Sequence, residues 1–362
     1  MIDIRQPIYP WFGSKRRVAD VIWRAFGEVD NFVDPFFGTM SVLLCAPWPA
    51  DRTETVNDAD GFVANAWRSI KYAPDETARH SDWIVSETDL EARHYWLVTE
   101  GREKLKTLLA DPHGYDPEIA GWWLWGQCCW IGAGWCAGDG PWFVNADGQW
   151  GMRDAGKGVN RQLPHMRNAG QGVNRKLPHM RNAGQGVNRQ RPHLGNAGQG
   201  VNRQRPHLGD AGQTHTEHLI ERFCALADRL RYVRICRGDW SRVLTHSVTA
   251  THGTTAVILD PPYSSERSMG VYVVDSPDVA HAVREWALAR GDDRQYRIAL
   301  CGHEGEHAMP DSWRVHKWSA TGGYSGCAKK AERGKANKHL ERIWFSPHCV
   351  RAANRQGSLF LD

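Results

Sequence analysis

The sequence predicts an α/β fold whose main domain is interrupted by a long insert. Short apolar runs such as Ala256–Leu259 are typical of buried strands, and they alternate with segments whose apolar residues recur at helical spacing. Strands that alternate with helices favour a largely parallel sheet with helices on both faces. The middle of the chain differs, because it is rich in Gly and Trp and shows no clear periodicity. We therefore expect residues 1–115 and 214–362 to form one domain, with residues 116–213 inserted into it.

The expected elements follow the chain in order, and each shows either an apolar run, one apolar face or a helix start signal. The predicted strands are Phe32–Val33, Tyr232–Ile235, Ala256–Leu259, Arg297–Leu300 and Arg342–Phe345. Two of the predicted helices begin at Met40 and at Ser276-Pro277. Another begins near Phe62, with one apolar face made of Phe62, Ala66, Trp67 and Ile70. A further helix follows the capping box Thr214–Glu217, and its apolar face is made of Leu219, Phe223, Leu226 and Leu230.

Composition disfavours several classes of protein. A chain of 362 residues with 41% hydrophobic content is long enough for one large domain with an addition. Nine cysteines, without any Cys-x-x-Cys pair, disfavour a disulfide framework and a zinc site, so we expect no metal and a reducing, cytoplasmic setting. The N-terminus lacks the features of a signal peptide. The uncharged stretch Ile119–Gly138 holds five Gly and five Trp, which favours a packed aromatic element over a membrane span.

The most informative motif is Asp260-Pro261-Pro262-Tyr263, directly after the apolar run that ends at Leu259. The two prolines keep the turn extended, so that Asp260 and the Pro261 carbonyl become two fixed hydrogen-bond acceptors. The exocyclic amine of a nucleobase is a poor nucleophile unless acceptors hold both of its hydrogens and favour a tetrahedral nitrogen. Tyr263 adds an aromatic face on which an extruded base can stack. The motif therefore predicts chemistry on the amino group of a base.

Five motifs, in this order, resemble those of the Dam-like (D12 class) adenine-N6 DNA methyltransferases. They are Pro10–Arg17, Asn31–Thr39, Val56–Asp58, Gly238–Trp240 and Asp260–Tyr263, and together they span nearly the whole chain. The resemblance implies a Rossmann-like methyltransferase domain with an inserted target-recognition domain. It also implies S-adenosyl-L-methionine as the cofactor and double-stranded DNA as the partner, with no membrane and no obligatory protein partner. The implied reaction transfers a methyl group to N6 of a flipped-out adenine.

The resemblance also implies roles for single residues. Gly38 would let the backbone approach the methionine part of the cofactor. Asp58 would bond the ribose hydroxyls, as an acidic residue does after the second strand of dinucleotide folds, and Asp239 would meet the adenine. The full implied set is Trp11, Lys15, Asp34, Phe36, Gly38, Asp58 and Asp239 for the cofactor, and Asp260, Pro261, Pro262 and Tyr263 for catalysis.

Two departures from the family pattern leave alternatives open. The family usually has a second Gly shortly after the first, where this chain has Thr39-Met40-Ser41, and the stretch Trp122–Gly132 lacks the Arg that touches DNA in relatives. Cytosine-N4 methylation is one alternative, because that amine is electronically similar, although such relatives more often have Ser in place of Asp260. A catalytically inactive DNA-binding protein on the same fold is the other. Intact Lys15, Asp58 and Asp260 favour the enzyme.

A repeat of fourteen residues runs four times from Gly156 to Ala211, with the pattern Gly-x-Gly-Val-Asn-Arg-x-x-Pro-His. This segment holds ten Lys or Arg and one acid, a net charge of +9 in a chain whose total is +4. Its few aliphatic residues bury a helix or strand face poorly. We expect a phosphate-binding arm, with a passive flexible expansion as the alternative. The predicted DNA-binding residues are Arg161, Arg175, Arg189 and Arg203 of the repeats, and Lys329 and Lys330 of a basic loop for which a solvated face is the alternative.

Overall fold

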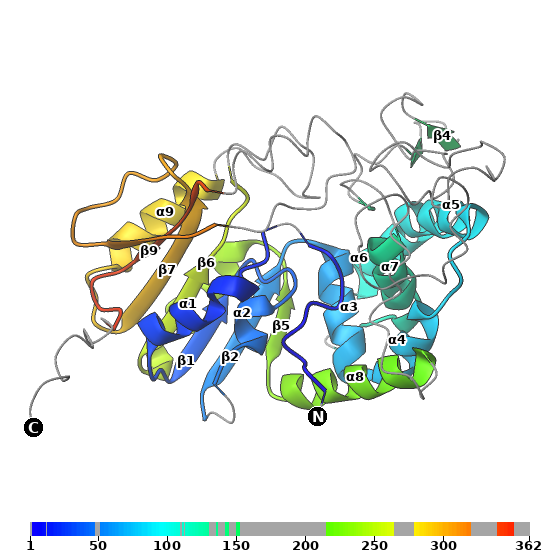
Figure 1. The fold of residues 1–362 in the computed structure, drawn as a ribbon, viewed down its shortest axis with the longest axis horizontal. Helices are drawn as coiled ribbons and strands as arrows, with labels where there is room; N and C mark the ends of the chain where they lie inside the picture. The colour runs from blue at the N-terminus through cyan, green and yellow to red at the C-terminus, as the bar shows by residue number, and fades with distance from the viewer. Residues whose placement is uncertain are drawn as a thin grey trace, which may run out of the picture.

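A seven-stranded sheet forms the centre of the molecule (Figure 1). The computed structural model describes residues 2–11, 13–47, 51–108, 111, 113–129, 135–136, 142–144, 150–152, 215–263, 279–319 and 339–350. The strands of the sheet are β1 (Asn31–Asp34), β2 (Thr53–Asp58), β5 (Arg234–Arg237), β6 (Thr255–Leu259), β7 (Tyr296–His303), β8 (Arg314–Lys317) and β9 (Glu341–Phe345). A separate antiparallel pair is made by β3 (Trp142–Val144) and β4 (Trp150–Met152).

The strand order in the sheet is β5-β2-β1-β6-β7-β9-β8. Every pairing from β5 to β7 is parallel, whereas β9 runs antiparallel to both β7 and β8. The order runs from β1 to β2 and β5 on one side, and from β6 to β7 on the other. The reversal between β1 and β6 is a topological switch point. Open α/β sheets bind their ligands at such a point, beyond the carboxyl ends of the strands.

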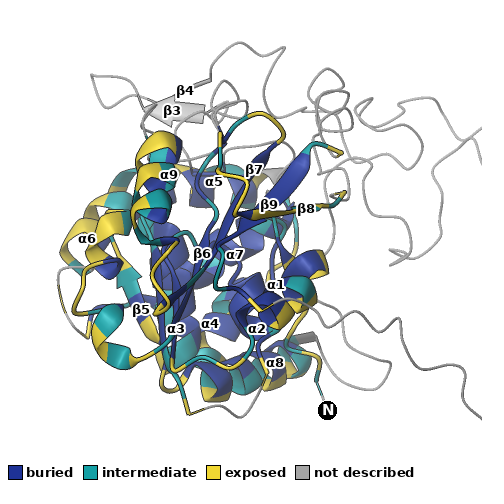
Figure 2. Cartoon of the chain, turned by 90° about the vertical axis from the view of Figure 1, so that its left-hand side faces the viewer, coloured by how far each residue is buried: buried dark blue, intermediate teal, exposed yellow. Residues whose placement is uncertain are grey.

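Alternation along the strands divides their apolar side chains between two cores. Phe32 and Ile258 belong to a larger core, together with residues of α1 (Ala19–Phe26), α2 (Ser41–Leu44) and α3 (Gly61–Tyr72). The neighbouring residues Val33 and Val257 belong to a smaller core that includes Val283 of α9 (Val279–Arg290). Figure 2 shows the strands buried in the middle of the molecule, with exposed residues on the outer sides of the helices. Parallel sheets typically have helices packed on both of their faces.

A group of helices extends the larger core to one side of the sheet (Figure 1). Two helices of this group, α7 (Pro117–Cys129) and α8 (His215–Leu230), each pack against both α3 and α4 (Pro74–Ser81). The helix α5 (Glu87–Trp96) contacts α7, and α6 (Arg102–Leu108) contacts α3. Trp123 and Trp125 of α7 are fully buried, which confirms the predicted aromatic element. Because α7 is apolar on most sides, its sequence shows no helical period. Gly121 allows the close approach of α4, since a Cβ there would lie 2.2 Å from the Cβ of His80.

Most predicted elements are confirmed, including the buried faces of α3 and α8. The strand predicted at Tyr232–Ile235 is wrong at its start, because Tyr232 is exposed in the turn after α8 and β5 begins at Arg234. The sequence does not predict β8, a mostly exposed and charged strand at the edge of the sheet. The helix predicted from Ser276 begins at Val279 as described, and Ser276 lies outside the described residues. The domain boundaries after residues 115 and 213 stay a prediction.

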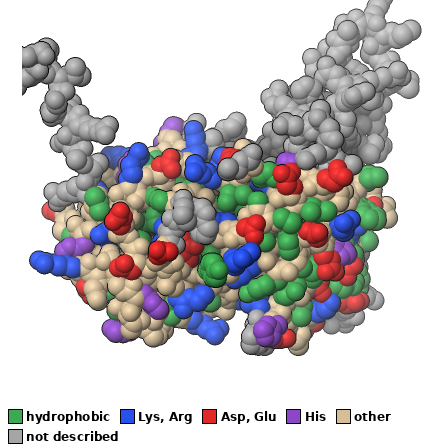
Figure 3. Space-filling model, turned by 90° about the horizontal axis from the view of Figure 1, so that it is seen from below, with side chains coloured by type: hydrophobic (Ala, Val, Ile, Leu, Met, Phe, Trp, Pro, Cys, Tyr) green, Lys and Arg blue, Asp and Glu red, His purple; other side chains and the backbone are tan. Residues whose placement is uncertain are grey.

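The view from below Figure 1 shows acidic and basic side chains intermingled over one face of the molecule (Figure 3). The described residues on this face therefore form no broad patch of a single sign. Among the helices that the structure describes, none combines the length and the apolar character needed to cross a bilayer. The repeats at 156–211 and the basic loop at 322–338 lie outside the described residues.

Candidate active site

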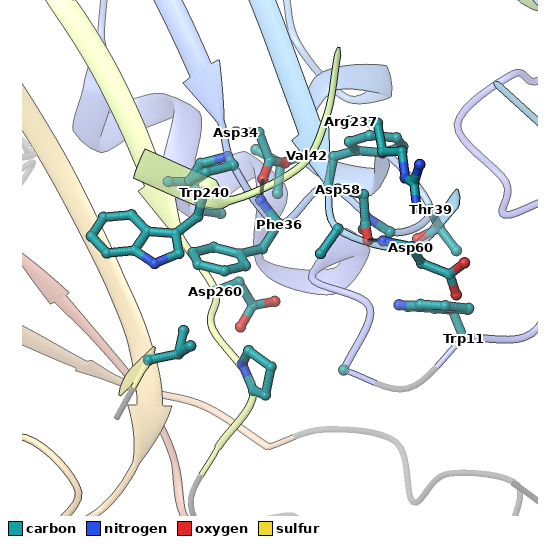
Figure 4. A pocket seen from close by; sticks show the side chains of 18 of the residues that line it. Trp11, Asp34, Phe36, Thr39, Val42, Asp58, Asp60, Arg237, Trp240 and Asp260 are labelled. Atoms are coloured by element: carbon teal, nitrogen blue, oxygen red, sulfur yellow. Dashed lines mark hydrogen bonds between the residues drawn. The ribbon is translucent and has the colours of Figure 1, made fainter. Parts of the chain in front are cut away.

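A cleft of about 660 Å³ opens beyond the carboxyl ends of β1, β2 and β6, at the switch point of the sheet. Asp34 ends β1, Asp58 ends β2 and Asp260 follows β6, so the parallel strands bring three carboxyl groups to one edge. Figure 4 shows these side chains around the cleft. All seven residues predicted for the cofactor line it, and so do Asp260 and Pro262, whereas Pro261 and Tyr263 are buried beside them.

The turn after β1 is held by polar contacts around Gly38. Its N–H donates to Asp58 Oδ2 at 3.1 Å, and its carbonyl accepts hydrogen bonds of 2.9 Å each from the Tyr9 hydroxyl and the Trp67 indole. Gly38 has a φ of 45°, and a Cβ built on it would lie 2.6 Å from Trp11 Nε1. Glycine is therefore required here both for its backbone conformation and for the close approach of Trp11.

The next turn is made without a glycine. Met40 has φ 53° and ψ 23°, a left-handed conformation that is uncommon for residues with a side chain. Its side chain is fully buried in the larger core, which holds the residue in place. The helix α2 begins directly afterwards, at Ser41. The backbone thus makes a left-handed turn in this loop although the second glycine of the family is missing from the sequence.

Asp58 and Asp60 form an acidic wall of the cleft, with Trp11 beside Asp60 (Figure 4). Asp58 Oδ1 accepts the N–H of Asp60 at 2.9 Å, and Asp60 Oδ1 accepts the N–H of Phe62 at 2.8 Å, which caps α3. Burial and the neighbouring charge of Asp60 raise the pKa of Asp58 to about 7. Burial also raises the pKa of Asp60. The charge of Asp58 therefore changes near neutral pH.

An aromatic pair, Phe36 and Trp240, lines the cleft beside Asp260 (Figure 4). The rings of Phe36 and Trp240 stack with their centres 6.3 Å apart and an angle of 26° between planes. Behind them, Asp34 is almost fully buried and accepts the N–H of Phe36 at 3.2 Å, and burial raises the pKa of its carboxyl. Asp239 is exposed and accepts the N–H of Ser241 at 2.9 Å, which starts a short 3-10 turn. The cleft thus offers a flat apolar surface next to an exposed carboxylate.

An ion pair joins Lys15 and Asp260 at the far end of the cleft. Lys15 Nζ lies 2.8 Å from Asp260 Oδ2, and the side chains are 2% and 21% exposed. Burial disfavours a charged Lys15, but Asp260 and Glu341 outweigh this effect and raise the pKa of the ammonium group. Burial raises the pKa of Asp260, and Lys15 opposes that rise. Lys15 is therefore a fixed cation beside the carboxyl group of the Asp260 motif.

Tyr263 is packed against this ion pair. Its hydroxyl lies 3.1 Å from Asp260 Oδ1 and 3.2 Å from Glu341 Oε2. Its ring is 3% exposed and packs edge-on against His303, with the ring centres 4.6 Å apart. Lys15 Nζ lies 5.2 Å from the centre of the Tyr263 ring. The ring faces inward in this structure, so the stacking role predicted for it stays a prediction.

Three residues of the site were not singled out from the sequence: Glu341, Asp60 and Met40. Asp60 directly precedes α3 and caps it, so a search for helix N-caps would have found it. Glu341 is the first residue of β9, where an acidic side chain in front of an apolar run gives only a weak signal. Met40 carries no signal for a left-handed turn, because its conformation is imposed by the packing around it.

The residues predicted to contact DNA, Arg161, Arg175, Arg189, Arg203, Lys329 and Lys330, lie outside the described residues. Within the described part of the chain, no group of three His, Cys, Asp or Glu side chains is arranged to hold a metal ion.

An open, mostly parallel sheet with an acidic and aromatic cleft at its switch point is typical of a Rossmann-like α/β fold. Residues 11–108 match the model of the family described as D12 class N6 adenine-specific DNA methyltransferase. The match supports a Dam-like adenine methyltransferase and indicates that the chain is an adenine-specific DNA methyltransferase. It also implies a DNA substrate and, in general terms, the use of S-adenosylmethionine. A search of curated proteins finds no match to the chain.

Proposed function

We propose that this enzyme transfers the methyl group of S-adenosylmethionine to N6 of an adenine that is extruded from duplex DNA. The observation that supports this most is the position of Asp260, whose carboxyl group lies at the switch point in the same cleft as Gly38 and Asp58. We call the part of the cleft around Gly38, Asp58 and Asp239 the cofactor end, and the part around Lys15 and Asp260 the amine end.

The residues of the cofactor end fit the proposed cofactor in shape and chemistry. The volume of the cleft, about 660 Å³, lies within the range of small-molecule sites. Asp58 would accept hydrogen bonds from the ribose hydroxyls, because each of its oxygens accepts one backbone N–H and keeps a further lone pair. Phe36 and Trp240 offer a flat surface for the adenine ring, next to the exposed Asp239. When bound, the cofactor supplies an electrophilic methyl group on a sulfonium.

The residues of the amine end would prepare the nucleophile. Asp260 and the Pro261 carbonyl would accept the two hydrogens of the N6 amine, so that its lone pair is withdrawn from the ring and directed at the methyl carbon. The new N–C bond forms as the C–S bond breaks, and the electrons of that bond stay on sulfur. The amine then loses one proton, for which Asp260 is an acceptor because burial raises its pKa. Lys15 holds Asp260 in this orientation through the 2.8 Å ion pair.

Tyr263 would stack on the extruded base. Because its ring is buried in this structure, the proposal requires one face of the ring to become exposed when DNA binds. The repeats at 156–211 would contact phosphates through their Arg side chains, as their net charge of +9 suggests. Deleting residues 156–211 should reduce the salt dependence of DNA binding and leave the methylated sequence unchanged. A variant with unchanged salt dependence and affinity would show that the repeats are passive.

The proposed function is tested with the purified full-length chain, duplex DNA and isotopically labelled S-adenosylmethionine, followed by mass spectrometry of the digested nucleosides. Labelled N6-methyladenine is expected, and single-molecule sequencing of DNA from an expressing host would give the recognition sequence. Calorimetry with S-adenosylmethionine alone tests the cofactor end separately. Labelled N4-methylcytosine in place of N6-methyladenine, or cofactor binding without any transfer to DNA, would overturn the proposal.

A further inference from the structure

The hydroxyl of Tyr263 lies between two carboxyl groups. It is 3.1 Å from Asp260 Oδ1 and 3.2 Å from Glu341 Oε2. A phenol carries one proton, so it can donate to only one of these two oxygens at a time. The Glu341 side chain is 5% exposed, which places it inside the protein behind Tyr263 rather than in the open cleft. Asp260 and Glu341 therefore compete for the same donor.

The ammonium group of Lys15 pairs with Asp260 and is also stabilised by the charge of Glu341. It pairs directly with Asp260 Oδ2 at 2.8 Å and donates to the Gly13 carbonyl at 2.8 Å. Burial opposes its charge, whereas Asp260 and Glu341 together raise the pKa of Lys15. Burial also tends to raise the pKa of Glu341, but Lys15, His303 and Tyr263 outweigh it, and the pKa of Glu341 is lowered. Glu341 is thus an anion beside a fixed cation.

The sheet, and not a loop, fixes the position of Glu341. It is the first residue of β9, and it pairs across the antiparallel ladder with His303, the last residue of β7. His303 Nε2 lies 3.8 Å from Glu341 Oε1, and the His303 ring packs edge-on against Tyr263. The Glu341 carboxylate is therefore held in place while the side chains of Tyr263 and Asp260 can exchange hydrogen bonds.

We propose that Glu341 is a positioning residue for methyl transfer. Glu341 accepts the hydrogen bond of the Tyr263 hydroxyl and balances the charge of Lys15, so that Asp260 can turn an oxygen to the target amine. This inference rests on the proposed function of Asp260. Both Asp260 oxygens are engaged in the present structure, one by Lys15 and one by Tyr263. With a neutral side chain at position 341, Asp260 would be the one carboxylate of the described residues that lies within hydrogen-bond distance of both donors, and it would remain committed to them.

The pH dependence of the reaction separates this role from a purely structural one. Among the described residues, the charged and titratable groups that face Asp260 are Lys15, Tyr263, Glu341, Asp34 at the end of β1 and Cys301 on β7, with His303 beyond Glu341. Burial raises the pKa of Asp260, Lys15 opposes the rise, and Glu341 adds to it. Removing the charge of Glu341 should therefore lower the pKa of Asp260. The acid limb of the pH–rate profile for methyl transfer should then move to lower pH. A loss of packing alone would leave that limb in place.

The test measures single-turnover methyl transfer to duplex DNA by the full-length chain and its variants across pH. Glu341→Gln should slow the transfer at least about tenfold and shift the acid limb to lower pH, with unchanged affinity for S-adenosylmethionine. Tyr263→Phe removes the hydroxyl that competes for Asp260, so the double variant should recover part of the rate that Glu341→Gln loses, because both changes act on one hydrogen bond. Glu341→Asp, which keeps the charge, should restore part of the rate and the acid limb of the wild type.

The matched control is Glu304→Gln. Glu304 follows His303 directly, but its side chain is 54% exposed and pairs with Arg342 at 2.7 Å, away from Asp260. It should behave like the wild type. Wild-type rate and acid limb in Glu341→Gln would overturn the inference, and so would a slow Glu341→Gln variant whose acid limb is unmoved and to which Tyr263→Phe restores no rate. If the wild type itself methylates no adenine, the proposed function fails instead, and the inference fails with it.

Discussion

At the cofactor end of the cleft, Asp58 is held by the backbone N–H groups of Gly38 and Asp60, whereas at the amine end Asp260 is held by the side chains of Lys15 and Tyr263. A carboxylate held by the backbone can move only if the loop moves with it. A carboxylate held by side chains can exchange partners while the backbone stays in place. The cofactor end is therefore suited to bind a rigid ligand, and the amine end to change its hydrogen bonds during a reaction.

The largest effect is expected from Asp260→Ala. This change removes the acceptor for the target amine, and a hydrogen bond to a charged group contributes about 1.5–3 kcal/mol. Each 1.4 kcal/mol corresponds to about tenfold in rate, so methyl transfer should fall at least tenfold. Affinity for S-adenosylmethionine, measured by calorimetry, should change little. Turnover like that of the wild type would show that the amine end was misassigned.

The equivalent change at the cofactor end, Asp58→Ala, should act mainly on cofactor affinity, whereas Asp260→Ala acts mainly on the rate of methyl transfer. It removes the proposed acceptor for the ribose hydroxyls, so cofactor binding should weaken by about 1.5–3 kcal/mol, while DNA affinity without cofactor is retained. Asp239→Ala, at the exposed carboxylate proposed to meet the adenine, should also weaken cofactor binding. If neither variant changes the dissociation constant of the cofactor, these positions do not bind it.

The pH dependence of cofactor binding should also distinguish the two ends. Burial raises the pKa of Asp58 to about 7, so the carboxyl group ionises as the pH rises through neutrality. Because the ionised form accepts the ribose hydroxyls, affinity should increase by about tenfold from pH 6 to pH 8. Asp58→Asn should abolish most of this increase, and an equally steep increase in that variant would assign it to another group.

The same group has the opposite effect on the free protein. A carboxyl whose pKa is higher in the folded state than in the unfolded state binds a proton preferentially when folded. Its contribution to the free energy of unfolding is therefore complete below about pH 4 and is lost as the pH rises towards and through 7. Urea denaturation of the wild type and of Asp58→Asn at pH 5 and pH 8 measures this difference, which should be larger for the wild type.

The smallest effect on binding is expected from Gly38→Ala. Its Cβ would lie 2.6 Å from Trp11 Nε1, so the loop or the indole must move, and cofactor affinity should fall several-fold. Gly305→Ala is the matched control, because Gly305 also has a positive φ, of 82°, and a Cβ there would have no atom of the described residues within 4 Å. Both variants should lose about 1–2 kcal/mol of stability through the left-handed backbone, but only Gly38→Ala should bind the cofactor more weakly. Equal cofactor affinities would remove the role given to this turn.

Much of the site could be predicted from the sequence, because its signals are local. The apolar run before Asp260 and the two prolines after it define a strand end and a rigid turn within a few residues. Asp58 ends a strand and stands shortly before a helix in a similar way. When successive strands are parallel and adjacent, their carboxyl ends lie at one edge of the sheet, so these local signals suffice to bring the side chains together.

The groups that surround Asp260 come together only through the pairing of distant strands. Glu341 lies 78 residues after Tyr263 and reaches its hydroxyl because β9 returns antiparallel beside β7. The conformation of Met40 and the burial of the Tyr263 ring likewise depend on residues distant in sequence. Strand pairing of this kind is a choice among distant partners that no short stretch of sequence encodes. The α/β fold class and the places of Asp34, Asp58 and Asp260 at strand ends follow from local sequence signals, whereas packing selects the donors that these carboxyl groups share.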